Sequence, residues 1–224
     1  MFSSQVTGTA SAKVAMSKSV TQVGFWAAAL TTAWIIAFSV TAIAGNFGVS
    51  VPATIVVGSA LLIAPCFLVM MVSIHHCTPV EKQIWSQIAL SFSIIYAVVV
   101  ALNYFLQLTV VPQNPQEYDW LALAFQADSA FFALEILGYA SMSLAALFVT
   151  PIFARGKIET VIRWLFIVNG TVNVVADVVY LMTADPLHPF VLASLGVWSV
   201  TFPIATGLLA VLFRRIEHLP PPYR

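Results

Sequence analysis

Six stretches of this chain are apolar enough and long enough to cross a lipid bilayer as helices. A hydrocarbon layer of about 30 Å needs about 20 residues at about 1.5 Å per residue. The runs cover residues 23–45, 51–75, 84–111, 121–150, 158–184 and 189–213, with turn or breaker residues between them. Only 8% of the 224 residues are charged and 60% are hydrophobic, unlike a soluble protein. The sequence predicts an all-α, polytopic integral membrane protein, a bundle of six transmembrane helices.

The distribution of charge predicts how this bundle is oriented. We expect residues 1–22 to form a mobile or interfacial tail, residues 23–213 the transmembrane domain and residues 214–224 a second tail. All nine Lys and Arg residues fall on one side, whereas the opposite loops hold Glu117, Asp119 and Asp185 and no basic residue. By the positive-inside rule, both termini and the Lys/Arg-bearing loops are predicted to be cytoplasmic.

Three acidic residues fall inside the predicted spans, where an ionised carboxylate costs about 2.5–3.5 kcal/mol on insertion scales. Asp128 and Glu135 lie seven positions apart in the fourth run. We therefore expect them on one helical face, about 10 Å apart along the axis. Asp177 of the fifth run is expected at the depth of Asp128, with Glu135 nearer the midplane. Because no Lys or Arg lies at these depths, some of the acids should be neutral unless a cationic ligand supplies the missing charge.

Polar and aromatic side chains are expected to line a cavity together with these acids. Asn169, Asn173, Asp177 and Tyr180 follow an i, i+4, i+8, i+11 pattern, which places them on one face of the fifth helix. The candidate substrate-binding residues are Asn103, Phe131, Tyr139, Asn169, Asn173, Tyr180, Trp34 and Trp198. The alternatives are ordinary packing for the aromatic side chains and structural cross-links between helices for the acids.

Several chemistries are excluded by what the sequence lacks. No span has a Lys for a retinal Schiff base, and none carries paired inward His residues for a haem or a di-iron cluster. We find no phosphate-binding glycine loop, no nucleophile elbow and no basic nucleic-acid surface. His75, His76 and Cys77 are metal-ligand types, but adjacent helical side chains diverge by about 100° and no second ligand cluster is present. We expect no cofactor, no metal site and no nucleic-acid partner.

The intramembrane acids favour an enzyme that acts by acid–base chemistry on a lipophilic, isoprenoid-like substrate, as an isomerase or a proton-initiated cyclase. One neutral carboxyl would donate a proton and another would accept one. The expected pair is Asp128 with Asp177, or Glu135 if the substrate lies deeper. The expected partners are the bilayer and a lipid or lipophilic small molecule.

Two other functions stay open. A proton- or cation-coupled transporter would use the same acids as ligands, and with so few spans it would work as a homo-oligomer. A non-catalytic subunit of a larger complex would bury its polar stripes against a partner.

Overall fold

The computed structural model describes residues 6–113, 129–154 and 156–217. These residues form helices and no strand. Six of the helices are long and apolar enough to cross a membrane, which confirms the predicted all-α, multi-pass architecture. They are α1 (Val6–Asn46), α2 (Ala53–Cys77), α3 (Gln83–Thr109), α5 (Ala130–Val149), α6 (Lys157–Thr183) and α7 (Pro189–Glu217). Short 3-10 turns follow three of them: η1 (Val80–Lys82), η2 (Val111–Gln113) and η3 (Thr150–Ile152).

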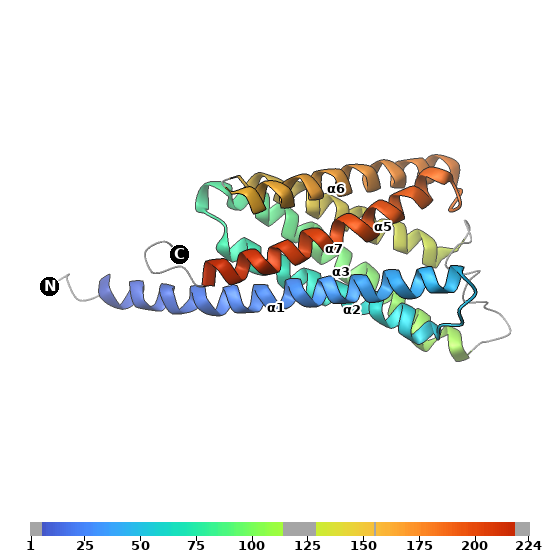
Figure 1. Cartoon of the computed structure of the whole chain (residues 1–224), viewed down its shortest axis with the longest axis horizontal. Coiled ribbons are helices and arrows are strands. Elements are labelled where there is room, and N and C mark those ends of the chain that lie inside the picture. The colour runs from blue at the N-terminus through green and yellow to red at the C-terminus, as the bar shows by residue number, and fades with distance from the viewer. Residues whose placement is uncertain (1–5, 114–128, 155, 218–224) are drawn as a thin grey trace.

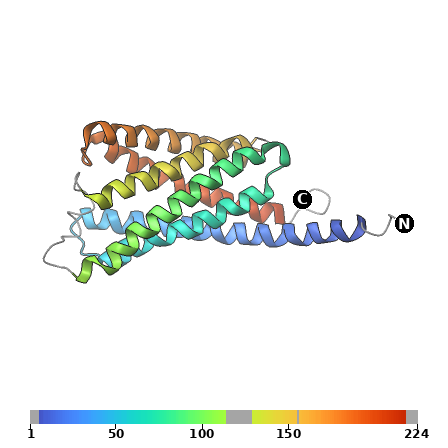
Figure 2. The same ribbon diagram turned by 180° about the vertical axis from the view of Figure 1, so that it is seen from behind.

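The long helices form a closed ring. Each one packs against its neighbours in the order α1, α2, α3, α5, α6 and α7, and α7 packs against α1. Successive helices run in opposite directions along the bundle (Figures 1 and 2). Such up-and-down topology is expected of spans joined by short connections. The ring order means that α5 has α3 on one side and α6 on the other, so both can supply partners to its buried side chains.

Helix α1 is longer than the apolar run that predicted it. It contains 41 residues, and its N-terminal part extends beyond the rest of the bundle (Figures 1 and 2). The apolar part of this helix is Ser19–Ala44. Residues 6–22 of the predicted tail are therefore helical and continuous with the first span.

The helix that carries Glu135 begins nine residues after the start of the predicted fourth run. Helix α5 begins at Ala130, because Ser129 has an extended backbone with φ −75° and ψ 126°. Residues 121–128, including Asp128, lie outside the described residues. Hydrophobicity marks a segment that can be buried, but it does not mark where a helix begins. The predicted alignment of Asp128 with Glu135 therefore lies outside the described residues.

Aromatic rings fill the centre of the ring of helices. Five of them form a circuit of neighbours with centroid separations of 5.4–6.3 Å, typical of favourable aromatic pairs. A sixth, from α6, lies 5.7 Å from the circuit. We call this group the aromatic cluster, and it consists of Phe67, Tyr96, Tyr139, Phe166, Trp198 and Phe202. All six side chains are buried. The cluster joins α2, α3, α5, α6 and α7 near the middle of the bundle.

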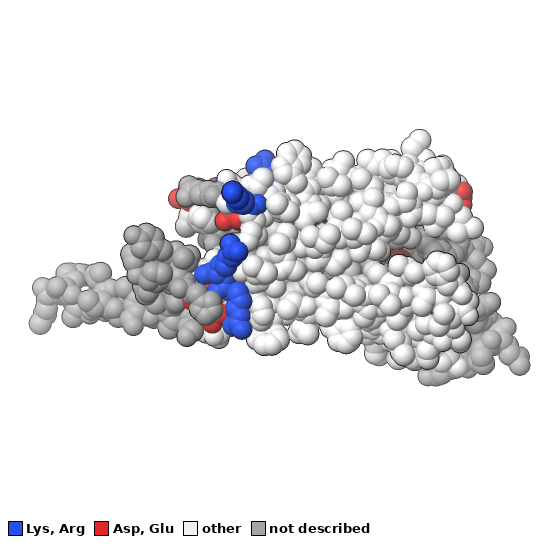
Figure 3. Space-filling view, in the orientation of Figure 1, with Lys and Arg blue, Asp and Glu red and all other residues white. Residues whose placement is uncertain are grey.

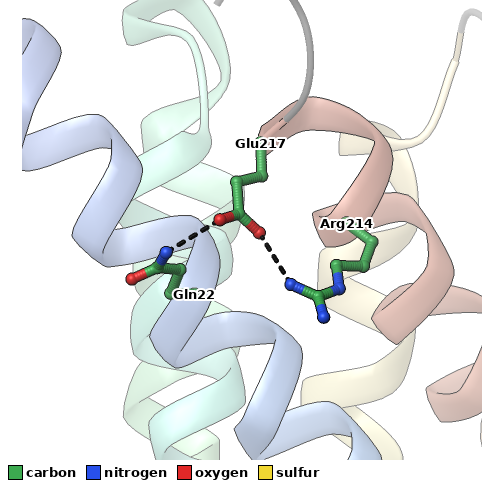
Figure 4. Close-up of polar contacts among 3 residues, drawn as sticks. All are labelled: Gln22, Arg214 and Glu217. Carbon is green, nitrogen blue, oxygen red and sulfur yellow. Dashed lines mark hydrogen bonds and ion pairs between the residues drawn. The ribbon is translucent and has the colours of Figure 1, made fainter.

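Charged side chains lie at the ends of the bundle. One end, which we call the basic end, carries the Lys and Arg residues seen in Figure 3, and the broad surface beyond them is largely uncharged. At this end Arg214 pairs with Glu217 at 3.3 Å, and Gln22 of α1 donates a hydrogen bond of 2.8 Å to the same carboxylate (Figure 4). This contact closes the ring between α1 and α7. We call the opposite end, with Asp185 in its α6–α7 turn, the far end.

Candidate functional site

Glu135 is held by a tyrosine from the neighbouring helix. The Tyr104 hydroxyl of α3 donates a hydrogen bond of 3.0 Å to Glu135 Oε1 of α5. Tyr104 is buried and Glu135 is partly buried. Tyr139 lies one helical turn beyond Glu135 on α5 and is also buried. We call these three residues the Glu135 cluster. Within the described ranges, the Tyr104 hydroxyl is the hydrogen-bond donor to Glu135, and no Lys or Arg forms an ion pair with this carboxyl.

The close approach of α3 and α5 depends on a glycine. A Cβ atom added to Gly138 would lie 2.6 Å from Val100 Cγ2, closer than side chains can tolerate. Only hydrogen fits between the helices at this point. Gly138 lies one turn from Glu135, and Val100 lies one turn from Tyr104. The missing side chain therefore allows the two helices to pack closely enough for the Tyr104–Glu135 hydrogen bond.

The Glu135 cluster packs against the aromatic cluster. The ring of Tyr139 lies 5.4 Å from Trp198 and 6.3 Å from Tyr96, so Tyr139 belongs to both groups. The faces of these rings are electron-rich and attract positive charge. An acid and a set of aromatic rings thus meet at one place in the interior.

Asp177 lies at the level of Glu135 on the adjacent helix, which corrects the predicted depths. Phe132 of α5 and Tyr180 of α6 have ring centroids 4.9 Å apart, and each carboxyl is three residues further into its helix. Glu135 is five residues from the start of α5 and Asp177 six from the end of α6, so both lie about 8–9 Å inside. The two carboxyls therefore do not differ in level by the roughly two helical turns that the prediction gave them. No hydrogen bond joins the two carboxyls in the described part of the chain.

The four-residue stripe of α6 faces inward. Asn169, Asn173, Asp177 and Tyr180 are all buried. Asn169 Nδ2 donates 2.9 Å to Thr201 Oγ1 of α7, whereas Asn173 Nδ2 donates 2.8 Å to the Asn169 carbonyl of its own helix. One of these amides is therefore a cross-link between helices and the other is bonded locally. The two asparagines of the stripe therefore bond to groups inside the bundle.

Some buried polar atoms have no protein partner among the described residues. The acceptors are Asp177 Oδ2 and Asn169 Oδ1, and the donors include Trp198 Nε1 and Asn103 Nδ2. Asn103 Oδ1 accepts 3.2 Å from Gln107 Nε2, so only half of that amide is satisfied. Buried polar groups nearly always have hydrogen-bond partners. Each of these atoms can bind a water molecule or a polar group of a ligand.

The remaining predicted residues take different places. Trp198 is buried inside the aromatic cluster, and Trp34 is half-buried against the main core. Phe131 is only partly buried, while its neighbour Phe132 is the buried partner of Tyr180. Asp128 lies outside the described residues.

Sequence reasoning missed Tyr104 as the partner of Glu135. A signal was present, because five buried residues of α3 follow an i, i+4, i+7, i+8, i+11 pattern: Tyr96, Val100, Asn103, Tyr104 and Gln107. Such a polar and aromatic face on an apolar helix indicates an inward orientation. It does not reveal which neighbouring residue the tyrosine meets.

The histidines at the end of α2 are bonded to protein groups. His75 Nδ1 is 2.8 Å from Ser86 Oγ, and His76 Nδ1 is 2.9 Å from the Val72 carbonyl. Within the described ranges, no three His, Cys, Asp or Glu side chains converge on a point that could hold a metal ion.

Comparisons of the chain with protein-family models, with curated proteins and with solved structures found no match.

Proposed function

We propose that this protein is a membrane-embedded acid–base enzyme that acts on a lipophilic, isoprenoid-like substrate, with Glu135 as its proton-transferring residue. The observation that carries the proposal is the Tyr104–Glu135 hydrogen bond at the edge of the aromatic cluster. A carboxyl that is partly buried and accepts a hydrogen bond from a neutral hydroxyl is suited to proton transfer. Tyr104 fixes its direction.

The reaction that fits this arrangement is a double-bond isomerisation. The Glu135 carboxyl adds its proton to one alkene carbon, and a carbocation forms next to it. The rings of Tyr139 and Trp198 stabilise that positive charge. Asp177, at the same level on α6, then removes a proton from a neighbouring carbon, so the double bond has moved. A proton passed from Asp177 to Glu135 through water restores both groups, and no other reactant is needed. If the cation is attacked by a second double bond first, the product is cyclic.

The surface supports entry from the lipid. The middle of the bundle presents an uncharged surface, and an acidic side chain is visible at the bottom of a recess in its far-end half (Figure 3). A lipophilic molecule in the bilayer would reach such a recess without crossing water. The bilayer and its lipids are the partners that this proposal requires.

Deuterium incorporation tests the proposal. Membranes containing the protein are incubated in deuterated buffer, and their lipids are analysed by mass spectrometry for carbon-bound deuterium that survives washing with ordinary water. We expect labelled lipid with the wild type, and a loss of about 10²-fold or more with Glu135→Gln, as for removal of a general acid. Asp177→Asn should also lose the label.

Asp185→Asn is the matched control, because it neutralises an exposed carboxyl in the far-end turn. It should label lipid as the wild type does. Equal labelling by Glu135→Gln and the wild type would refute the assignment.

A second candidate function is a proton-coupled carrier, and one observation favours it. A cavity of about 600 Å³ opens at the basic end and is lined by Phe153, whose ring lies 6.2 Å from Phe166 of the aromatic cluster. The cluster would then be a gate between this cavity and the acids. In proteoliposomes a carrier would move a solute in response to a pH gradient and leave lipid chemistry unchanged.

We further infer that the basic end is cytoplasmic, since the described Lys and Arg side chains gather there. Cys77 is exposed at this end. A membrane-impermeant maleimide should label it in inverted vesicles and not in intact cells, with Cys66→Ala removing the other thiol. Labelling in intact cells would reverse the orientation.

A further inference from the structure

The cavity at the basic end is a separate site from the Glu135 cluster. It lies where α2, α6, α7 and the turns η1 and η3 meet, and its volume of about 600 Å³ is within the range of about 300–1,000 Å³ for small-molecule pockets. The aromatic cluster separates it from the acids of the far-end half. This inference therefore does not depend on the proposed function.

The inner wall of this cavity is apolar. Leu212, Phe213 and Ile216 of α7 line it, and Phe153 and Ile152 face them from η3 and the residue that follows. The position of Phe213 requires a glycine in α1, because a Cβ atom on Gly24 would lie 2.6 Å from the Phe213 ring. Removing such surface from water stabilises a bound alkyl chain by about 25 cal/mol per Å². The wall therefore fits a hydrocarbon chain.

The rim of the cavity carries charges of both signs. Lys82 Nζ donates 2.6 Å to the Pro151 carbonyl and 3.4 Å to the Ile152 carbonyl, so it ties the α2–α3 connection to the α5–α6 connection. Both of these partners are neutral, and the described part of the chain offers Lys82 no ion pair. Glu81 is exposed beside it, and Glu159 also lines the cavity and accepts 3.2 Å from the Ala154 N–H.

We propose that this cavity binds a zwitterionic single-chain amphiphile, with its phosphate at Lys82, its ammonium at Glu81 and its chain against the α7 wall. A purely anionic head group would be repelled by Glu81, and a purely cationic one by Lys82. A phosphate linked to an ammonium group can place its negative end at Lys82 and its positive end at Glu81. The contact between Lys82 and the phosphate is a charge-assisted hydrogen bond, about twice as strong as a neutral one, and the contact between Glu81 and the ammonium is an ion pair. The basic end of a membrane protein lies at the level of lipid head groups, where such molecules are present.

Three probes test the proposal: a fluorescent single-chain phosphocholine, the trimethylammonium analogue and the phosphate analogue, all with the same chain and label. The full-length protein is titrated in an uncharged detergent. We expect saturable binding of the phosphocholine, about tenfold tighter than either analogue, the gain of one charge-assisted contact. If either analogue binds as tightly as the phosphocholine, or if no probe shows saturable binding, the proposal is wrong.

Matched variants locate the site. Leu212→Trp fills the cavity and should abolish phosphocholine binding, whereas Val211→Trp, at the neighbouring exposed position, should leave it unchanged. Glu81→Gln should lower phosphocholine affinity to that of the phosphate analogue. Since Glu81 is exposed, this variant should fold normally and keeps the test valid even if a bulky Trp disturbs the bundle. Unchanged binding by Leu212→Trp, or by Glu81→Gln, would overturn the proposal.

Discussion

Glu217 at the basic end and Glu135 in the far-end half are the same residue type in opposite settings. Glu217 is buried, but it pairs with Arg214 and accepts a hydrogen bond from Gln22. Glu135 has a tyrosine hydroxyl as its hydrogen-bond donor, and no cation from the described part of the chain pairs with it. A guanidinium partner favours the ionised form of a carboxylate, and the hydrogen bond from Gln22 joins α1 to α7. The comparison teaches that burial alone does not identify a carboxyl suited to the proposed proton transfer, because the more buried Glu217 has a cationic partner and the less buried Glu135 has a neutral one.

The two regions also differ in how their polar atoms are satisfied. At the basic end, Lys82, Arg214 and Glu217 all bond to protein groups. In the far-end half, Asp177 Oδ2 and Asn103 Nδ2 are buried without a partner among the described residues. Leaving such groups unmatched costs about 1–3 kcal/mol each, so water or a ligand is expected to bind them. The buried polar side chains of the far-end half therefore have spare hydrogen-bonding capacity.

The packing that creates the Glu135 cluster can be broken directly. Gly138→Ala should lower the free energy of unfolding by about 1–3 kcal/mol, because the new methyl group overlaps Val100 and pushes α3 from α5. The Tyr104–Glu135 hydrogen bond should lengthen and lipid labelling should fall. Unfolding in mixed detergent micelles measures the first effect. Gly196→Ala is the control, since its added methyl group meets open space, and it should be neutral or stabilising by about 0.5–1 kcal/mol. Equal destabilisation by both variants would contradict the packing argument.

Removing one hydroxyl sharpens the comparison. Tyr104→Phe should lower the free energy of unfolding by about 1 kcal/mol, the net contribution of one hydrogen bond. Deuterium labelling of lipid should fall by about tenfold, less than with Glu135→Gln, because the acid remains but is less well oriented. Tyr96→Phe removes a hydroxyl from the same helix and the aromatic cluster without touching that hydrogen bond. If Tyr96→Phe lowers labelling as much as Tyr104→Phe, the orienting role belongs to the cluster as a whole.

The smallest effect is expected at the basic end. Glu217→Gln should cost less than about 1 kcal/mol, because the Arg214 side chain is 51% exposed and water screens the pair. The loss should shrink further at high salt, as a partly exposed ion pair does. Lipid labelling should equal that of the wild type. A drop in labelling comparable to that of Glu135→Gln would erase the distinction between the two carboxyls.

The membrane architecture was predictable because each span is a local property. Hydrophobicity summed along some twenty residues identifies a helix that can cross the bilayer whatever its neighbours are. The start of the fourth helix was not predictable in this way. Ser129 has an extended backbone within an apolar run. The summed hydrophobicity of the run hardly changes at a single serine, so it gives no sign of the helix start.

The candidate site was predicted only in part. The inward face of Asn169, Asn173, Asp177 and Tyr180 followed from helical spacing alone. The partner of Glu135 did not, because Tyr104 belongs to another helix, 31 residues away in the chain. Whether two such side chains meet depends on the rotation and register of α3 against α5, which Gly138 and Val100 decide by contact.

By itself, the sequence determined that the chain crosses the membrane in six helices, that its basic residues fall on one side and that acids are placed in apolar surroundings. Only the tertiary structure decided which acid has an arginine, which has a tyrosine and which has an unmatched oxygen. The physical reason is that the first kind of property is local in the sequence, whereas the second depends on residues that are distant in it. The free energy of transfer from water to lipid is a sum over residues along the chain. A hydrogen bond requires two atoms about 3 Å apart, and the packing of the helices into a ring sets that distance.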